Sequence, residues 1–302
     1  MCAAQTRPEC LLACGAVVIT GASSGIGEAF VKVITNLNPK AKFFNLSRTA
    51  PDDSLAAGQL EHCPADLSSA RGQEAAITAV EAWLDGAGQT GGILLINNSG
   101  FGSFGFFPEP SLERSLQMID LNIRAPVLLT SRLLSRLKER GGAIINISST
   151  AAFQPTPFFA IYGGTKAFIM NWSLGLWREL RDTQVHVLCV CPGPTNTNFF
   201  CAAGFLKPPV SEKMCQTSLQ VVQASLRALA TRKPLVVCGW SNKLAVMISS
   251  RIPRVWVTRL TYMTLKKLST GPKIEKIKAP SPAFNESWQS MPVGKENAVT
   301  RD

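Results

Sequence analysis

The feature that most constrains the fold is a regular alternation of short apolar runs with longer helical patterns. The runs are apolar on both faces, which is typical of strands in a buried parallel sheet. They are residues 16–20, 42–46, 92–97, 143–148, 185–192 and 234–239. Stretches 111–140 and 163–182 have helical periodicity, and the second turns Ile169, Trp172, Leu176 and Leu180 toward the sheet. The alternation predicts one α/β domain with a doubly wound parallel sheet and right-handed crossovers.

A glycine-rich loop follows the first predicted strand. The sequence TGASSGIGEAF places glycines at 21, 25 and 27 immediately before a helical pattern. Glycine permits a tight turn close to a pyrophosphate, and the free N–H groups at a helix start favour that anion. No Gly-Lys-Ser/Thr follows, which excludes a Walker-type nucleotide loop. The loop therefore predicts a dinucleotide-binding site.

The end of the second predicted strand indicates which dinucleotide is bound. An Asp or Glu near this point usually selects an unphosphorylated ribose, whereas this chain has Ser47 and Arg48. A guanidinium pairs with a 2′-phosphate, which a carboxylate would repel. We expect NADP(H) to be preferred over NAD(H). The alternative is that Arg48 is a solvated side chain at a strand end.

Composition excludes several other classes of protein. The chain is 46% hydrophobic and 17% charged, as a folded globular protein is. Its nine cysteines form no C-x-x-C pair and it has two histidines, so we predict neither a disulfide framework nor a metal site, and a reducing, cytoplasmic location. Arg7, Pro8 and Glu9 interrupt any secretory signal, and no apolar run is long enough to span a membrane.

Tyr162 is one of only two tyrosines in a chain with fifteen phenylalanines, and Lys166 follows it by four residues. A lone pair of this kind is more often an aromatic packed at a helix start with a lysine in solvent. On a helix, however, the spacing places both side chains on one face, where the ammonium can lower the pKa of the phenol. Phenylalanine has the same shape but no proton to give.

Seven elements together carry a resemblance to a known family. They are TGASSGIG, Asp66-Leu67, NNSG (97–100), Asn122, NISS ending at Ser149, YGGTK (162–166) and PGPTNT (192–197). In order and spacing they resemble the short-chain dehydrogenase/reductase family over about residues 15–200. The later sequence resembles a branch related to the oxidoreductase of D-alanyl-lipoteichoic acid operons and to ketoacyl and hydroxysteroid reductases. The resemblance implies a Rossmann-type fold, NAD(P)-dependent exchange between C=O and CH–OH groups, and a homo-oligomer.

The resemblance also implies roles for individual residues. Tyr162 would donate the proton, Lys166 would hold the nicotinamide ribose, and Ser149, rather than Ser148, would bond the substrate oxygen. Asn122 would hold a water linked to Lys166, or else be a helix-surface amide. The implied cofactor-binding residues are Gly21, Ser23, Ser24, Gly25, Ile26, Gly27, Arg48, Asp66, Leu67, Asn97, Asn98, Gly100, Tyr162, Lys166, Pro192, Gly193, Thr195 and Thr197. The chain departs from the family pattern at Ser99, usually alanine, and at Ser24, where a basic residue would favour NADP(H).

The remaining segments define the predicted organisation. Residues 1–14 are an N-terminal extension, and 15–240 form the catalytic domain with a substrate lid at about 198–231. The apolar lid sequence suggests an apolar carbonyl or alcohol substrate. Residues 241–268 predict a basic amphipathic helix, which either covers the cleft or a subunit interface, or contacts a membrane surface. Residues 269–302 are rich in Pro, Ser and charge and predict a flexible tail.

The chain carries a formal charge of +11, and between Lys243 and Lys278 nine Lys and Arg residues face a single acid, Glu275. No nucleic-acid recognition module accompanies this charge, so nucleic acid is not a predicted partner. Two functions remain on the sequence alone. One is an NADP(H)-dependent oxidoreductase that uses Tyr162 as its acid. The alternative is a non-catalytic protein that senses NADP(H) and acts through its basic helix.

Overall fold

The computed structural model describes residues 14–56, 58–89, 91–205 and 215–269. Most of the predicted N-terminal extension, residues 206–214 of the predicted lid, and all but the first residue of the predicted tail lie outside these ranges. The features below refer to the described residues.

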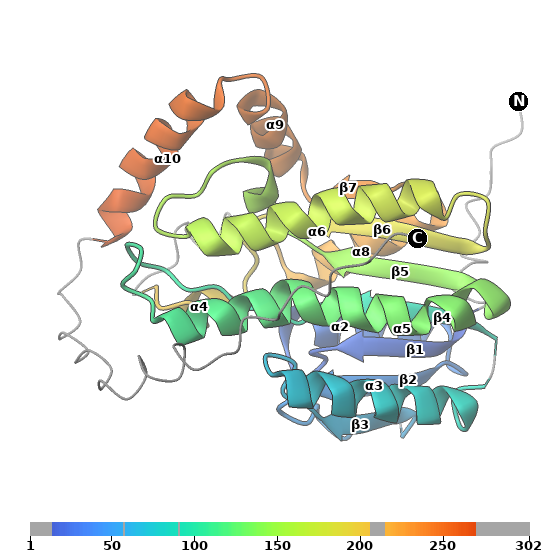
Figure 1. The fold of residues 1–302 in the computed structure, drawn as a ribbon. Helices are drawn as coiled ribbons and strands as arrows, with labels where there is room; N and C mark the ends of the chain where they lie inside the picture. Colours follow the sequence, from blue (N-terminus) through green and yellow to red (C-terminus); the bar gives the residue numbers. More distant parts are fainter. Residues whose placement is uncertain (1–13, 57, 90, 206–214, 270–302) are drawn as a thin grey trace, which may run out of the picture. The chain divides into compact units, whose positions relative to one another are not determined.

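The core of the fold is a seven-stranded sheet in which every neighbouring pair is parallel (Figure 1). The strands are β1 (Cys14–Thr20), β2 (Lys42–Ser47), β3 (Leu60–Pro64), β4 (Gly92–Asn97), β5 (Gly142–Ile147), β6 (Val185–Cys191) and β7 (Leu235–Val237). Their order is β3-β2-β1-β4-β5-β6-β7, so the winding reverses between β1 and β4. This confirms the predicted doubly wound, Rossmann-type sheet.

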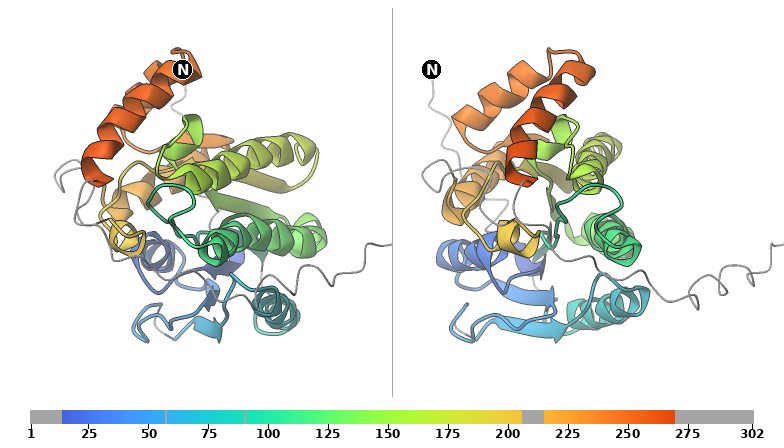
Figure 2. Two further views of the ribbon diagram at one scale, coloured as in Figure 1. Left: turned by 60° about the vertical axis from the view of Figure 1, so that its left-hand side comes forward. Right: turned by 90° about the vertical axis from the view of Figure 1, so that its left-hand side faces the viewer.

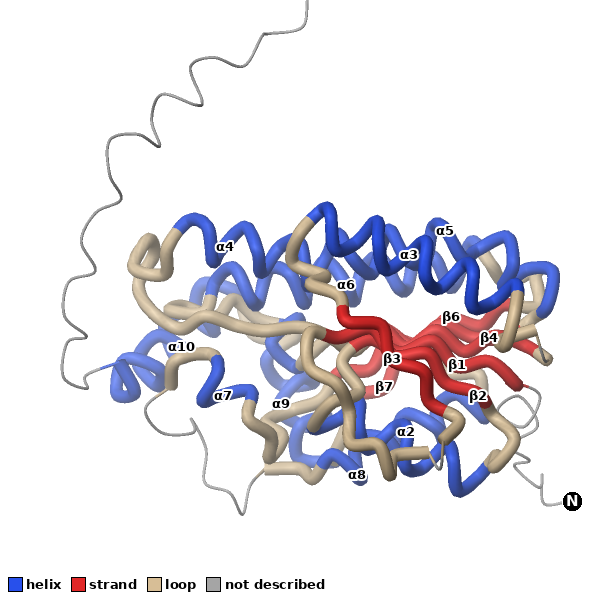
Figure 3. The backbone as a smooth tube through the Cα atoms, turned by 90° about the horizontal axis from the view of Figure 1, so that it is seen from below, coloured by secondary structure: helices blue, strands red, loops and turns tan. Residues whose placement is uncertain are grey.

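Helices cover both faces of the sheet (Figure 3). On one face lie α2 (Gly25–Leu37) and α8 (Ser218–Ala230), and on the other lie α3 (Ala70–Asp85), α5 (Ala125–Arg140) and α6 (Ala160–Glu179). Each face has its own buried apolar cluster against the sheet. Because both sheet faces are buried, the central strands carry apolar side chains on both faces, as the sequence indicates.

The second half of the predicted lid belongs to the core. The short helix α7 (Phe199–Ala202) follows β6, but α8 buries Val221, Val222, Leu226 and Leu229 in the same apolar cluster as α2. A capping box between Thr217 and Gln220 begins α8, so its start is fixed by the chain itself. Residues 218–230 of the predicted lid, 198–231, therefore belong to the packed core.

The helical pattern at 111–140 is interrupted. It forms α4 (Leu112–Ile119), a π-helical turn at Asp120–Arg124, and then α5. Pro126 has no N–H to donate to the carbonyl of Asn122, so the regular i to i−4 ladder cannot continue there. Ala125 instead donates to the carbonyl of Asp120, five residues back. The wider turn contains Asn122, one of the predicted site residues.

The predicted helix at 241–268 is two helices, α9 (Trp240–Ser249) and α10 (Arg254–Ser269), shown in orange in Figure 2. Pro253 cannot donate a bond that would extend α9, and its carbonyl accepts from Trp256 and Val257 in the first turn of α10. The chain therefore turns between the two helices. Over the described ranges, no helix combines the length and the apolar character needed to cross a membrane.

The placement of α8 gives a direct test of the fold. Leu226 is 6% exposed in the core, whereas Leu219 on the same helix is 49% exposed. We expect Leu226→Ala to lower the free energy of unfolding by about 2–5 kcal/mol, because it leaves a cavity in the core. Leu219→Ala should change it by less than about 0.5 kcal/mol. Urea denaturation of both variants measures this, and equal effects would contradict a core position for α8.

Candidate active site

The predicted site residues gather where the parallel strands end. The glycine loop follows β1, Arg48 follows β2, Asp66 follows β3, and the loop with Asn98 and Gly100 follows β4. Carboxyl ends of parallel strands share one edge of the sheet, and the reversal of winding between β1 and β4 opens a crevice there. The fold thus brings together segments that are far apart in the sequence.

The glycine loop fits an anion. Gly21 and Gly25 have φ angles of 74° and 63°, which only glycine adopts readily, and a Cβ on Gly27 would lie 2.1 Å from the carbonyl oxygen of Gly21. Ser24 is the N-cap residue of α2, yet its side chain makes no capping bond, unlike the caps of α3 and α8. The first N–H groups of α2 therefore remain available to a phosphate.

Two buried polar residues that sequence reasoning missed hold this loop in place. The Oδ1 atom of Asn45, in β2, accepts from the backbone N–H of Ala22 at 2.9 Å. The hydroxyl of Thr20 accepts from the N–H groups of Asn98 and Ser99 at 3.0 and 2.9 Å. A single polar residue within or at the end of an apolar strand was the only signal that the sequence offered.

Arg48 and Asp66 lie exposed on neighbouring strand ends. A side-chain hydrogen bond from Ser68 lowers the pKa of the Asp66 carboxyl, and the Arg48 guanidinium adds a smaller effect in the same direction. The Asp66 carboxyl, on the predicted adenosine side, therefore lies within electrostatic reach of the Arg48 guanidinium. The Leu67 side chain is 3% exposed and packs in the core, and its role in cofactor binding stays a prediction.

Tyr162 is buried near the start of α6, where Phe159 stacks on it with ring centroids 4.4 Å apart. Burial raises the pKa of its phenol to about 12, and a side-chain hydrogen bond with Ser149 acts in the opposite direction. Ser149 lies directly before a short 3-10 turn at Thr150–Phe153. The neighbouring hydroxyl, on Ser148, instead donates to the backbone carbonyl of Lys166 at 2.7 Å. The geometry thus favours Ser149 over Ser148 as the partner of the phenol.

Lys166 is also buried, one helical turn after Tyr162. Its Nζ donates to the carbonyl of Ile147, at the end of β5, at 2.9 Å and lies 5.7 Å from the centre of the Tyr162 ring. Burial lowers the pKa of the ammonium to about 8. We predicted that Lys166 lowers the pKa of the phenol. In the structure burial is the largest effect on the pKa of the phenol, and it raises that pKa.

Asn122 is 1% exposed, so its alternative interpretation as a surface amide is wrong. Its Nδ2 donates to the Phe101 carbonyl and to the Thr165 hydroxyl, both at 3.0 Å, and its Oδ1 accepts from the Phe101 N–H at 3.1 Å. The side chain thus joins the loop after β4 to α6. Both of its N–H donors are used in these contacts. A Cβ on Gly100 would lie 3.0 Å from Oδ1, so glycine allows this close approach.

The motif after β6 reaches the glycine loop. A Cβ on Gly25 would lie 3.2 Å from the Thr197 methyl group, and the Pro192 carbonyl accepts from Thr150 at 2.9 Å, beside Ser149. Thr195 is buried and donates to the Gly193 carbonyl at 3.0 Å. The Asn97 amide donates to Asn146 at 2.7 Å inside the protein, and its role in cofactor binding stays a prediction.

The chain matches the family model of short chain dehydrogenases over residues 15–203. It is 36% identical to a serine 3-dehydrogenase from Rhizobium radiobacter over 193 residues, which are 61% of this chain and 74% of the relative. It is 28% identical over 244 residues to a 17-beta-hydroxysteroid dehydrogenase type 3 from Mus musculus, with 78% and 75% covered. The structure of a short-chain dehydrogenase from Sphingobium yanoikuyae in complex with NADPH superposes with a TM-score of 0.63 at 26% identity, over 87% of this chain and 98% of that one.

The buried ammonium makes a prediction about stability. The unfolded chain keeps the Lys166 proton up to its ordinary pKa of 10.5, whereas the folded chain releases it near 8. Between these values the unfolded state binds more protons, so this residue makes the free energy of unfolding rise with pH, by on the order of 3 kcal/mol in total. Below pH 8 Lys166 is protonated in both the folded and the unfolded state, so it adds no pH dependence to the free energy of unfolding there.

We expect Lys166→Met to remove this rise. Urea denaturation of both proteins from pH 7.5 to 10 gives the difference curve, in which groups other than Lys166 cancel. Lys138→Met, which removes an exposed lysine from α5, serves as the control and should leave the profile unchanged. Parallel profiles for the native protein and Lys166→Met would mean that the buried amine does not titrate in this range.

Proposed function

The chain belongs to the short chain dehydrogenase/reductase family, and we propose that it reduces a carbonyl to an alcohol with NADPH, or runs the reverse reaction, with Tyr162 as the proton donor. Members of this family act on CH–OH and C=O groups, and the chain is an oxidoreductase of this class. The observation that carries the proposal is a buried phenol whose pKa Ser149 lowers and whose ring centre lies 5.7 Å from the Lys166 Nζ.

The chain's residues fit the cofactor. The pyrophosphate fits the uncapped start of α2 beside Gly21 and Gly25, and Arg48 is exposed where the ribose 2′-phosphate of NADPH would lie. Lys166 would hold the nicotinamide ribose. Thr197 would contact the carboxamide of the nicotinamide ring. The NADPH complex of the Sphingobium relative supports the same choice of cofactor.

The site residues can perform the proton chemistry of a reduction. Bound NADPH supplies a hydride to the carbonyl carbon. The Ser149 hydroxyl would donate a hydrogen bond to the carbonyl oxygen, which gains negative charge during the reaction. A phenol with a pKa of about 12 keeps its proton at neutral pH, and an alkoxide is basic enough to take it. The nearby Lys166 ammonium would stabilise the phenolate that remains, until solvent restores the proton.

We also infer that the substrate carries an apolar group. Phe159 and Phe199 contact the Tyr162 ring, with centroids 4.4 and 5.2 Å away, and Met118 packs in the same cluster. These side chains surround the phenol with apolar surface. Such surroundings offer few hydrogen-bond partners to a hydrophilic substrate. The cytoplasmic location stays a prediction. The homo-oligomer stays a prediction.

The catalytic role is tested by Tyr162→Phe. We expect turnover of a responsive carbonyl, found by screening a panel with NADPH, to fall by about 10²–10⁴-fold, because the acid is lost. NADPH affinity, measured by fluorescence titration, should stay within about threefold. Tyr262→Phe, at the only other tyrosine, is the matched control and should retain turnover. If the native protein binds NADPH but turns over no carbonyl, the sensing function is favoured. Equal turnover by Tyr162→Phe would remove the phenol from the mechanism.

The cofactor preference is tested at Arg48. Arg48→Asp replaces a cation that would pair with the 2′-phosphate by a group that repels it, so we expect NADPH affinity to fall by about tenfold or more. NADH affinity should be unchanged or higher. Arg178→Asp makes the same change on an exposed position of α6 and should affect neither. Loss of both cofactors to the same extent at Arg48 would contradict a specific contact with the phosphate.

A further inference from the structure

The helices α9 and α10 expose an unusual number of large apolar side chains. Together with the turn between them they form what we call the α9–α10 surface. Its exposed apolar members are Trp240, Leu244, Met247, Ile248, Ile252, Val255, Trp256, Leu260, Tyr262 and Met263. Trp240 is 79% exposed and Trp256 is 63% exposed. Exposed apolar side chains gathered on two consecutive helices in this way mark a binding face rather than an ordinary solvated one.

Few contacts connect these helices to the rest of the fold. Val257 is buried, Val246 packs beside Cys189 and Cys191, and the Tyr262 ring stacks on Phe158 with centroids 5.2 Å apart. In Figure 2 the two helices lie at one side of the domain, away from the sheet. The inner contacts therefore use a small part of the apolar surface and leave the outer part for a partner.

The charge of the surface indicates what that partner is. Residues 240–269 contain no acid, and their cations are Lys243, Arg251, Arg254, Arg259, Lys266 and Lys267. In the ranges that the structure describes, the guanidinium groups of Arg251, Arg254 and Arg259 form no ion pair with a carboxylate. The guanidinium of Arg259 lies 5.4 Å from the Trp256 ring, so cation and aromatic ring share one patch. Such a surface favours an anionic and apolar partner.

We propose that the α9–α10 surface docks onto an anionic lipid bilayer. Tryptophan rings and basic side chains together match the boundary between headgroups and acyl chains, where the apolar parts enter the membrane and the cations meet lipid phosphates. A second copy of this chain fits less well, because a two-fold contact would place two faces of the same positive charge against each other. The helices lie on the membrane and do not span it.

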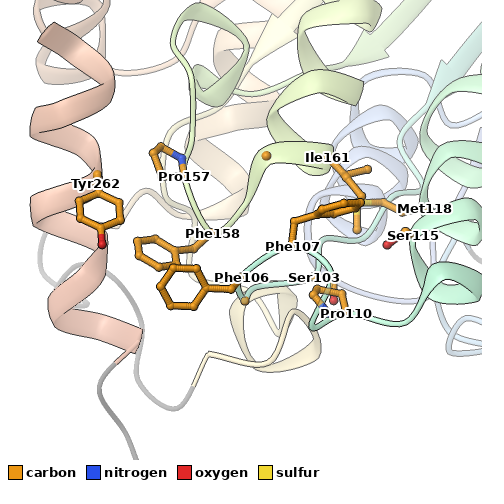
Figure 4. A pocket seen from close by; sticks show the side chains of 12 residues that line it. Ser103, Phe106, Phe107, Pro110, Ser115, Met118, Pro157, Phe158, Ile161 and Tyr262 are labelled. Atoms are coloured by element: carbon orange, nitrogen blue, oxygen red, sulfur yellow. The ribbon is translucent and has the colours of Figure 1, made fainter. Parts of the chain in front are cut away.

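An apolar cavity of about 160 Å³ adjoins the α9–α10 surface (Figure 4). Tyr262 of α10 lines it together with Phe106, Phe107 and Phe158, and Phe107 is 75% exposed. Tyr262 belongs both to α10 and to the cavity wall. Docking of α10 would therefore bring this wall of the cavity close to the lipid. Vesicle binding requires no turnover, so this inference and the proposed reaction succeed or fail separately.

The test is cosedimentation of the full chain with phosphatidylcholine vesicles that contain or lack phosphatidylserine. We expect binding only with phosphatidylserine, weakening as salt is raised. Residues 270–302 also carry lysines, so variants must assign the binding to the helices. Leu260→Ser should weaken it about tenfold, because an apolar side chain no longer enters the lipid. Arg259→Gln should weaken it about fivefold, because one cation near the lipid surface is lost.

Matched controls make the same changes elsewhere. Leu219→Ser on α8 and Arg178→Gln on α6 remove exposed residues of the same type and should leave vesicle binding unchanged. NADPH affinity, equal in all four variants, shows that each is folded. Equal binding to both vesicle types, or equal loss in variants and controls, overturns the proposal. The proposal is also overturned if the native chain does not bind vesicles and forms, in sedimentation velocity, a dimer that Leu260→Ser dissociates.

Discussion

The candidate site depends on one interaction, the hydrogen bond from the buried Lys166 ammonium to the Ile147 carbonyl. A cation inside a protein is costly, and the lowered pKa of Lys166 reflects that cost. The position is maintained because the amine is held at the end of β5 while Ser148 bonds the backbone of the same lysine. The positions of the side chains in the site are therefore set by the junction of the central strand β5 with α6. The loops are placed relative to that junction.

Asn122 extends this arrangement to a third segment. The π-helical turn interrupts a helix that would otherwise run from α4 into α5, and irregular backbone of this kind has a cost. The bonds from Asn122 to Phe101 and Thr165 offset it, since they join the loop after β4 to α6. Gly100 passes so close to Asn122 and Lys166 that a side chain there would meet both. The same network that shapes the site thus also ties the middle of the sheet to its helices.

The sequence predicted what periodicity and motif spacing encode. Strands β1, β2, β4, β5 and β6 agree within two residues because they are apolar on both faces, whereas the half-exposed edge strand β3 was not among the apolar runs. Helix α8 was assigned to the lid from its place after the cofactor motif, although Val222, Leu226 and Leu229 have core spacing. The motif residues do converge at one edge. Asn45 could not be foreseen, since its partner Ala22 is set by strand pairing, and the raised pKa of Tyr162 depends on burial in the folded protein.

Two adjacent residues connect the α9–α10 surface to the buried phenol of Tyr162. Phe158 stacks on Tyr262 of α10, and Phe159 stacks on Tyr162 of α6. Phe158 has a φ angle of 63°, a conformation that a bulky residue adopts only when its surroundings enforce it. The strained backbone is what lets neighbouring rings face two different helices. A shift of α10 that keeps the stacking of Tyr262 on Phe158 would therefore have to move the dipeptide whose second ring packs on Tyr162.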